Sequence, residues 1–334
     1  MRDFGYLNRK ISEHIVDIEE NFDITVDEYA VLMRNIYRMS EEIIKSASPY
    51  MNECRKEIYC NPYKRGISLT ETIKIVLKFL NTIDENLCSV FEQTIENGTI
   101  LFHSKKELEK LHITKDNFYY FYNLAGFHNG TPVVNIIYTN TISDVFIIVH
   151  EFAHYLSLGA KENKSLAWLH FTEGYSYTFE KLLYQFLKEQ TKWCSEAEKY
   201  NIQNNYIMCL KSYEFRNEFV AFDIFLNYGS FTPQKVLKYC EGEYFKEKLA
   251  SRILNNARIS ERYLLDTEKT LREYLEDSRY VLALPFSVCL LKNFKGNKED
   301  ILDDIFTLED KTFEYFLDKY DLENVKEYQK IFKV

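Results

Sequence analysis

Apolar residues recur every three to four positions over most of this chain, which is the spacing of an amphipathic helix. The repeat covers residues 11–59, 68–97, 145–158 and 167–189, and it returns in several pieces between 205 and 330. Ser68 and Glu71 form a candidate capping box at the start of the second stretch, and Asn97-Gly98 closes it. The pattern predicts a mainly α fold.

Breaks between helices are expected where Pro and Gly interrupt the repeat, at 61–66, 229–233, 242 and Pro285. Residues 99–140 differ from the rest. Short β-branched runs at 99–102 and 132–138 are strand candidates, with a loop at 126–132 between them. We expect a small β-sheet here, and the strand at 132–138 is a candidate to pair with an extended peptide.

The helix predicted at 145–158 has a defined start and stop. Thr141 or Ser143 can serve as N-cap, Asp144 favours the first turn, and Gly159 lies where a C-cap would fall. This helix contains the string His-Glu-Phe-Ala-His at 150–154. Two histidines four residues apart on a helix lie one turn above each other, so both imidazoles can reach one metal ion. Glu151 is then placed to activate a water bound to that metal.

A catalytic zinc site needs three protein ligands and one open position, so a third ligand is required beyond His150 and His154. Glu173 lies on the next predicted helix, which can return antiparallel and bring its carboxylate to the histidines. Two histidines and one glutamate suit a single Zn²⁺ ion. Glu180 shares the helical face of Glu173, as does Ser176. Glu180 is either a second-shell acceptor that orients a histidine or a solvated helix residue. We interpret His170 and His128 as ordinary histidines and not as ligands.

Composition excludes several classes of function. The 334 residues carry a net charge of −9, so a nucleic-acid partner is not expected. Seven scattered cysteines without a C-x-x-C pair indicate neither a disulfide framework nor a cysteine zinc site. The N-terminus lacks a signal-peptide core and no run is apolar enough to cross a bilayer, so we expect no membrane partner and a cytoplasmic location. The oligomeric state is open.

The stretch from Thr131 to Phe146, running directly into His-Glu-Phe-Ala-His, resembles the oligoendopeptidase F branch of the thimet oligopeptidase family. The spacing of Glu173, Ser176 and Glu180 is also similar to the ligand-glutamate helix of that family. The resemblance extends over about 55–330 and is specific over 130–182. It implies a gluzincin-type zinc metallopeptidase that cuts short peptides inside a helical bowl. The implied ligands are His150, His154 and Glu173, with Glu151 as the catalytic carboxylate.

The chain departs from the family in two respects. Family members are commonly longer, so residues 1–54 are interpreted as a short N-terminal helical remnant and 55–334 as the catalytic domain, expected to be one compact unit. The family has a C-terminal motif with a histidine and several tyrosines, whereas here no histidine follows His170. Tyr280 and Tyr274 are the candidate hydrogen-bond donors to the oxyanion. The alternative is that these side chains pack against the protein with their hydroxyls in water. Tyr263 is a further tyrosine in this region. Pro285 stands where a glycine is usual.

The expected function is therefore zinc-dependent hydrolysis of peptide bonds in oligopeptides, with a peptide as the partner. Two alternatives stay open at this point. One is a processing protease dedicated to a single peptide substrate. The other is a catalytically weak homologue that only binds peptides.

Overall fold

Two compact units make up the chain in the computed structural model, which describes residues 4–22, 24–51, 55, 65–108, 110, 123–128, 130–159, 165–189, 192–267, 271, 275, 277–294 and 296–322. Unit 1 combines Met1–Ala47 with Met208–Leu282, and unit 2 combines Ser48–Ile207 with Ala283–Val334. This division differs from the predicted boundary after residue 54, because the chain leaves unit 1 after Ala47 and returns to it at Met208. The assignment of 55–334 as a catalytic domain stays a prediction.

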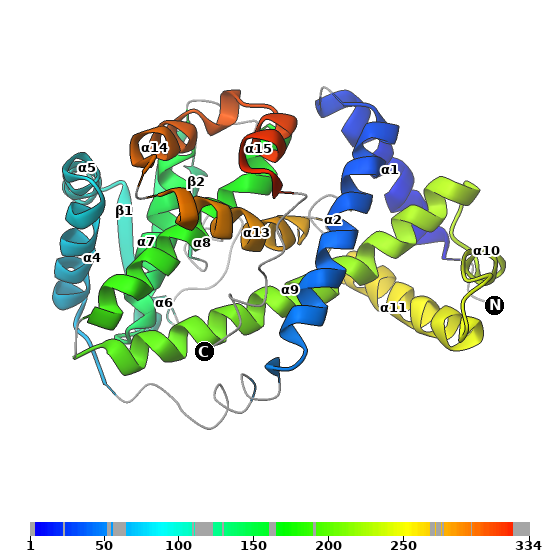
Figure 1. Ribbon diagram of the computed structural model, residues 1–334, viewed down its shortest axis with the longest axis horizontal. Helices are drawn as coiled ribbons and strands as arrows, with labels where there is room; N and C mark the ends of the chain where they lie inside the picture. The colour runs from blue at the N-terminus through cyan, green and yellow to red at the C-terminus, as the bar shows by residue number, and fades with distance from the viewer. Residues whose placement is uncertain are drawn as a thin grey trace. The chain divides into compact units, whose positions relative to one another are not determined.

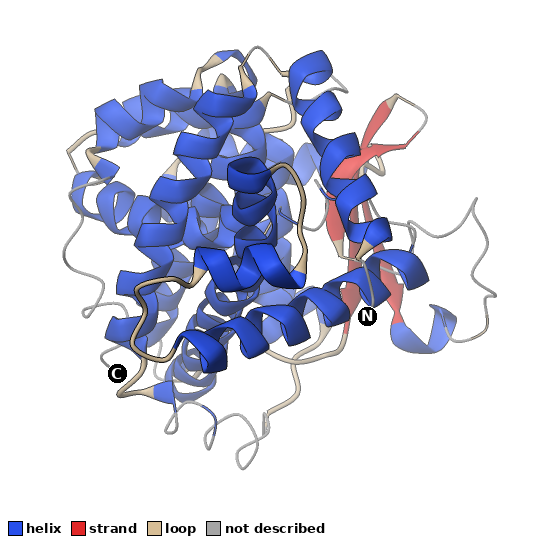
Figure 2. Cartoon of the chain, turned by 90° about the vertical axis from the view of Figure 1, so that its right-hand side faces the viewer, coloured by secondary structure: helices blue, strands red, loops and turns tan. Residues whose placement is uncertain are grey.

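The mainly α fold with a small sheet is confirmed (Figure 2). Unit 1 is helical in its described part. Its elements are α1 (Gly5–Asn21), α2 (Val26–Ala47), the second part of α9 (Cys194–Tyr228), α10 (Pro233–Tyr239), α11 (Lys246–Thr267) and the first residues of α13 (Ser278–Asn293).

Packing in unit 1 follows the apolar stripes of its helices. Leu7, Ile11 and Ile18 of α1 are buried at helical spacing. Arg34 of α2 is fixed to α9, since its Nη2 lies 2.8 Å from Oδ1 of Asp223. The predicted breaks at 229–233 and 242 are confirmed, because α10 lies between them.

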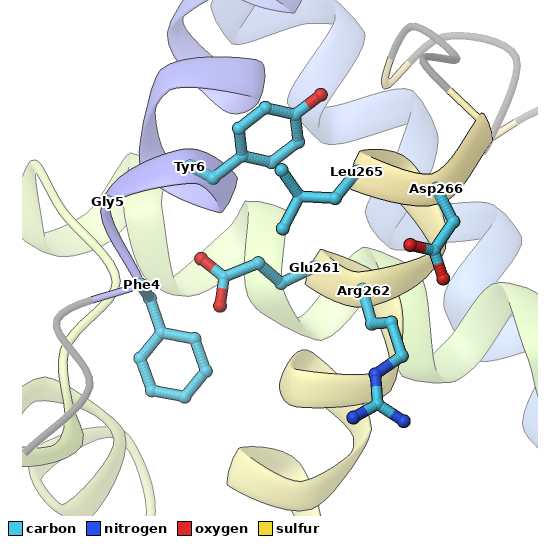
Figure 3. Close-up of a pocket in the computed structure, with 7 residues that line it drawn as sticks. All are labelled: Phe4, Gly5, Tyr6, Glu261, Arg262, Leu265 and Asp266. Atoms are coloured by element: carbon cyan, nitrogen blue, oxygen red, sulfur yellow. The ribbon is translucent and has the colours of Figure 1, made fainter.

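A surface hollow of about 490 Å³ lies between the first residues of α1 and the last turns of α11 (Figure 3). Glu261 of α11 extends toward the start of α1, where its Oε1 accepts a hydrogen bond from the backbone N–H of Leu7 at 3.4 Å. A carboxylate at a helix N-terminus satisfies a backbone donor that has no partner within the helix. This contact therefore joins two chain segments that are far apart in sequence.

Unit 2 contains the sheet and the helices around it (Figure 1). In chain order its elements are α4 (Leu69–Ile83), α5 (Glu85–Glu96), β1 (Ile100–Ser104), α6 (Lys105–Leu108), β2 (Leu124–His128), β3 (Thr131–Tyr138), α7 (Ser143–Leu156), α8 (Leu166–Glu189), the first part of α9, the rest of α13, α14 (Lys298–Phe306), a 3₁₀ turn (Leu308–Asp310) and α15 (Phe313–Tyr320).

The sheet has the strand order β1-β3-β2, with β1 parallel and β2 antiparallel to β3. One expectation was wrong. Part of the predicted loop at 126–132 is strand, because Gly126–His128 end β2 and pair back onto Val133–Thr131 around a turn at Gly130. On β3, Val134–Tyr138 pair with β1 and Thr131–Asn135 pair with β2, so both sides of the strand are paired at Val134 and Asn135. The pairing of this strand with a peptide stays a prediction.

Three helix predictions also need correction. The single helix expected over 68–97 is two helices, α4 and α5, separated at Asp84. Pro285 does not end a helix but lies inside α13. Neither Thr141 nor Ser143 is the N-cap of α7: the N-cap is Ile142, without a side-chain hydrogen bond. In the part of the chain that the structure describes, no helix is both long and apolar enough to span a bilayer.

Candidate metal centre

Helix α7 carries the His-Glu-Phe-Ala-His string and is anchored at its start by Asp144. The Asp144 carboxylate accepts hydrogen bonds from the backbone N–H and the hydroxyl of Thr139, at 3.0 and 2.8 Å, and from the N–H of Thr141 at 3.2 Å. These contacts tie the end of β3 to the first turn of α7. Asp144 therefore fixes the segment that leads into α7, while the N-cap residue Ile142 makes no side-chain hydrogen bond.

Apolar residues hold α7 in the interior of unit 2. Val145, Ile148, Val149 and Phe152 are fully buried. The ring of Phe152 packs edge-on against Phe91 of α5, with centroids 5.1 Å apart. The polar residues His150, Glu151 and His154 thus extend from a helix whose other sides are covered by apolar neighbours.

Helix α8 returns antiparallel to α7, as predicted. His150 contacts Glu180 and His154 contacts Thr172, so the order of residues is reversed between the two helices. Glu173 lies between these contacts. Gly174 beside it lets α13 approach closely, because a Cβ atom there would lie 2.3 Å from Cδ1 of Phe286.

The structure brings His150, His154 and Glu173 together into a group that could hold a metal ion. Nε2 of His150 lies 3.0 Å from Nε2 of His154 and 3.5 Å from Oε2 of Glu173. Nε2 of His154 lies 3.7 Å from Oε1 of Glu173. Ligand atoms about 2.1 Å from a tetrahedral zinc ion would be separated by about 3.4 Å, so the three side chains fit such an ion.

The other nitrogen of each imidazole has its own partner. Nδ1 of His150 lies 2.5 Å from Oε1 of Glu180, and Nδ1 of His154 lies 2.7 Å from Oγ1 of Thr172. If Nδ1 donates in both contacts, both Nε2 atoms keep a lone pair that points into the site. An acceptor on the second ring nitrogen is a common property of metal-binding histidines.

The site contains more buried acid than buried base. Glu151, Glu173 and Glu180 are all buried, beside two histidines. Burial lowers the pKa of His150, but the hydrogen bond and charge of Glu180 and the charges of Glu173 and Glu151 outweigh it and raise the pKa to about 10. Buried negative charge requires compensation, and a divalent cation would supply it.

Glu151 lies beside the ligand group and is not part of it. Burial raises the pKa of the Glu151 carboxyl to about 7, and the negative charges of Glu173 and Glu180 also raise it. The charge of His150 and a hydrogen bond with the backbone of Ala125 on β2 lower this pKa. The carboxylate therefore lies next to the sheet edge as well as to the histidines.

The remaining candidate residues lie outside the ligand group. Nδ1 of His170 lies 2.9 Å from the carbonyl oxygen of Leu166, and His128 is the last residue of β2. Ser176 is buried and donates within α8 to the carbonyl of Thr172. Tyr280 belongs to the part of α13 in unit 1, where its hydroxyl accepts from Arg279 at 3.2 Å. Tyr274 lies outside the described residues, so the oxyanion role of both tyrosines stays a prediction.

Sequence reasoning missed two residues that support the site. Thr172 immediately precedes Glu173, so a hydroxyl beside a candidate ligand was a signal for it. Asn204 on α9 donates to Oε2 of Glu180. Asn204 lies 24 residues after Glu180, and no local sequence pattern indicates a contact over that separation.

No protein family model matches the chain, and no curated protein matches it. Among solved structures, the chain is similar to the crystal structure of a putative peptidase from Chlamydophila abortus, with a TM-score of 0.49 and 15% sequence identity. The match covers 98% of this chain and 58% of that one, so this chain spans little more than half of its length. A similarity of this degree assigns the chain to no family and to no activity. The likeness to oligoendopeptidase F stays a prediction.

Proposed function

We propose that this chain is a zinc-dependent metallopeptidase that hydrolyses oligopeptides. The observation that carries the proposal is the convergence of His150, His154 and Glu173, whose nitrogen and oxygen atoms lie 3.0 to 3.7 Å apart, with the buried carboxylate of Glu151 beside them. A structural zinc site is closed by four protein ligands. A three-residue group with an adjacent carboxylate has the composition of a hydrolytic site instead.

Zinc is the metal that this ligand set favours. Imidazole nitrogen and carboxylate oxygen are borderline-to-hard ligands, and two histidines with one glutamate are a frequent set in zinc hydrolases. When bound, the metal ion supplies a Lewis acid that polarises the scissile carbonyl and acidifies a water molecule. The remaining steps depend on residues of the chain.

Glu151 is the proposed general base. Its carboxylate takes a proton from the water that attacks the peptide carbonyl, and it returns that proton to the leaving amine when the C–N bond breaks. The products are a carboxylic acid and an amine, and Glu151 is regenerated. In the metal-free protein burial raises the pKa of the Glu151 carboxyl to about 7, well above its ordinary value of 4.5.

The outer edge of β2 is the proposed binding surface for the substrate backbone. Within the described residues this strand pairs with β3 on one side only, and its Ala125 hydrogen-bonds with Glu151 through the backbone. An extended peptide that pairs with this edge would pass close to Glu151. Backbone pairing recognises peptides with little dependence on side chains, so oligopeptides of varied sequence are the expected substrates.

The test compares the zinc-loaded wild type with Glu151→Gln on a mixture of peptides, followed by mass spectrometry. We expect one zinc per chain in both proteins, and hydrolysis reduced about 10²- to 10⁴-fold in the variant. Glu196→Gln is the matched control, because Glu196 is a buried carboxylate of unit 2 outside the ligand group. It should hydrolyse peptides like the wild type.

A Glu151→Gln protein that retains the wild-type rate would contradict the proposal. Zinc binding without hydrolysis by the wild type would leave a metal-dependent peptide-binding protein. The products separate the two kinds of protease: cleavage of many peptides indicates general turnover, and cleavage at a single sequence indicates a processing enzyme.

A further inference from the structure

Both carboxylate oxygens of Glu180 have a partner in the structure. Oε1 lies 2.5 Å from Nδ1 of His150, and Oε2 accepts a hydrogen bond from the side-chain amide of Asn204 on α9. A carboxylate can only accept, so Asn204 must present its Nδ2 atom. Glu180 is buried, and its carboxylate is therefore held between a residue of α7 and a residue of α9.

We propose that Asn204 is a positioning residue for the metal centre, acting on His150 through Glu180. This inference rests on the proposed function, because it takes His150 as a metal ligand. A glutamate side chain has several rotatable bonds, and one contact at Oε1 would leave its carboxylate free to turn. The second contact fixes the carboxylate plane, which in turn fixes the orientation of the imidazole.

The neighbouring amides of α9 have a different task. Asn201 and Asn205 accept hydrogen bonds from the ammonium group of Lys181, and Asn205 also accepts from the hydroxyl of Tyr177 at 2.5 Å. These contacts hold α9 against α8 without the help of Asn204. Removal of the Asn204 amide should therefore leave the two helices packed and affect the Glu180 carboxylate.

Asn201 on α9 provides a matched control for Asn204. Asn201 and Asn204 are three residues apart on α9 and face the same neighbouring helix, where Asn201 contacts Lys181 and Asn204 contacts Glu180. Asn201→Ala and Asn204→Ala remove the same chemical group from the same helix. Only the second change removes the contact with the carboxylate that supports His150.

The experiment measures the zinc affinity of full-length wild type, Asn204→Ala, Asn204→Asp and Asn201→Ala by competition with a chromophoric chelator. We expect Asn204→Ala to bind zinc about tenfold more weakly, at the lower end of the effects seen for outer-shell partners. Asn204→Asp should bind more weakly still, because a second carboxylate would repel Glu180. Asn201→Ala should bind like the wild type.

Metal-free protein labelled with ¹⁵N-histidine gives a second readout. The Nδ1 proton of His150 should exchange slowly in the wild type and in Asn201→Ala, and it should broaden or disappear in Asn204→Ala. Wild-type zinc affinity and an unchanged His150 signal in Asn204→Ala would overturn the inference. An equal loss in Asn201→Ala would overturn it too, since packing of α9 would then be the cause. If wild type binds zinc but cleaves no peptide, the proposed function fails while the affinities still decide the role of Asn204.

Discussion

Gly174 shows how closely a single residue next to the metal centre is constrained. A Cβ atom at this position would lie 2.3 Å from Cδ1 of Phe286. Phe286 cannot readily move, because it is fully buried and its ring packs against Phe171 and Tyr175 with centroid distances of 5.0 Å in both cases. The absence of a side chain at Gly174 therefore lets α13 pack directly behind Glu173.

Gly174→Ala is expected to destabilise the protein. Replacing a helical glycine by alanine normally stabilises a helix by about 1 kcal/mol. Here we expect a net loss of up to about 2 kcal/mol, because overpacking a rigid core costs about 1–3 kcal/mol and outweighs the gain in helix propensity. Urea unfolding measures the change. Gly66→Ala is the control, since its Cβ would meet only the Asn140 carbonyl oxygen at 3.8 Å; equal stability of the two variants would contradict the packing argument.

At the residue scale, the sequence predicts those parts of the site that obey a local spacing rule. His150 and His154 are one helical turn apart, and Glu173 lies on the next helix. The single assumption that this next helix runs antiparallel to the first brings all three residues together. Asn204 obeys no such rule. Asn204 reaches Glu180 because α9 packs beside α8, and packing between helices depends on side chains all along both of them.

At the scale of elements, Asp84 explains why the helix predicted over 68–97 is two helices. Its backbone is extended, with φ −156° and ψ 135°, and its side chain accepts a hydrogen bond from the N–H of Asn86 at 2.8 Å. Asp84 thus follows the last residue of α4 and caps the first turn of α5. Periodicity misses this break, because the apolar residues on both sides continue the same repeat.

Asp84→Ala should lower the free energy of unfolding by about 1 kcal/mol through loss of the N-cap. The partly exposed ion pair with Lys298, at 3.3 Å, adds little to this value. The hydrogen bond from Asn86 holds the pKa of Asp84 below its ordinary value of 3.8, so its contribution is present above that pH and is lost as the pH falls through the lowered pKa. Thermal unfolding at pH 7 measures the loss. Asp84→Asn keeps an acceptor at the cap, and a similar loss there would contradict the capping explanation.

Pro285 illustrates an error of the opposite kind. Proline in a helix interior costs about 3 kcal/mol because it removes a hydrogen bond and clashes with the preceding turn. Helix α13 tolerates Pro285 while its neighbours Ala283, Leu284 and Phe286 are fully buried. Burial of apolar surface at about 25 cal/mol per Å² can exceed that cost. A local rule predicts a break here, and the packing that overrides it is not visible in the local sequence.

At the scale of the whole molecule, the candidate metal centre belongs to one of the two compact units. His150, His154 and Glu173 all lie between Ser48 and Ile207, and so do Glu180 and Asn204 that support them. Unit 1 contributes no residue to the ligand group. A ligand that binds only the folded state stabilises the region whose folding creates its site.

Zinc is therefore expected to protect unit 2 selectively. At a free concentration of about 100 times its Kd, the ion should stabilise unit 2 by about 2.7 kcal/mol. Hydrogen exchange followed by mass spectrometry, with and without zinc, should show slower exchange in α7 and α8 and unchanged exchange in α1, α2 and α11. His154→Gln removes a ligand and should abolish the difference. Equal slowing in both units would instead show that they unfold as one cooperative body, and slowing confined to unit 1 would place the zinc site elsewhere.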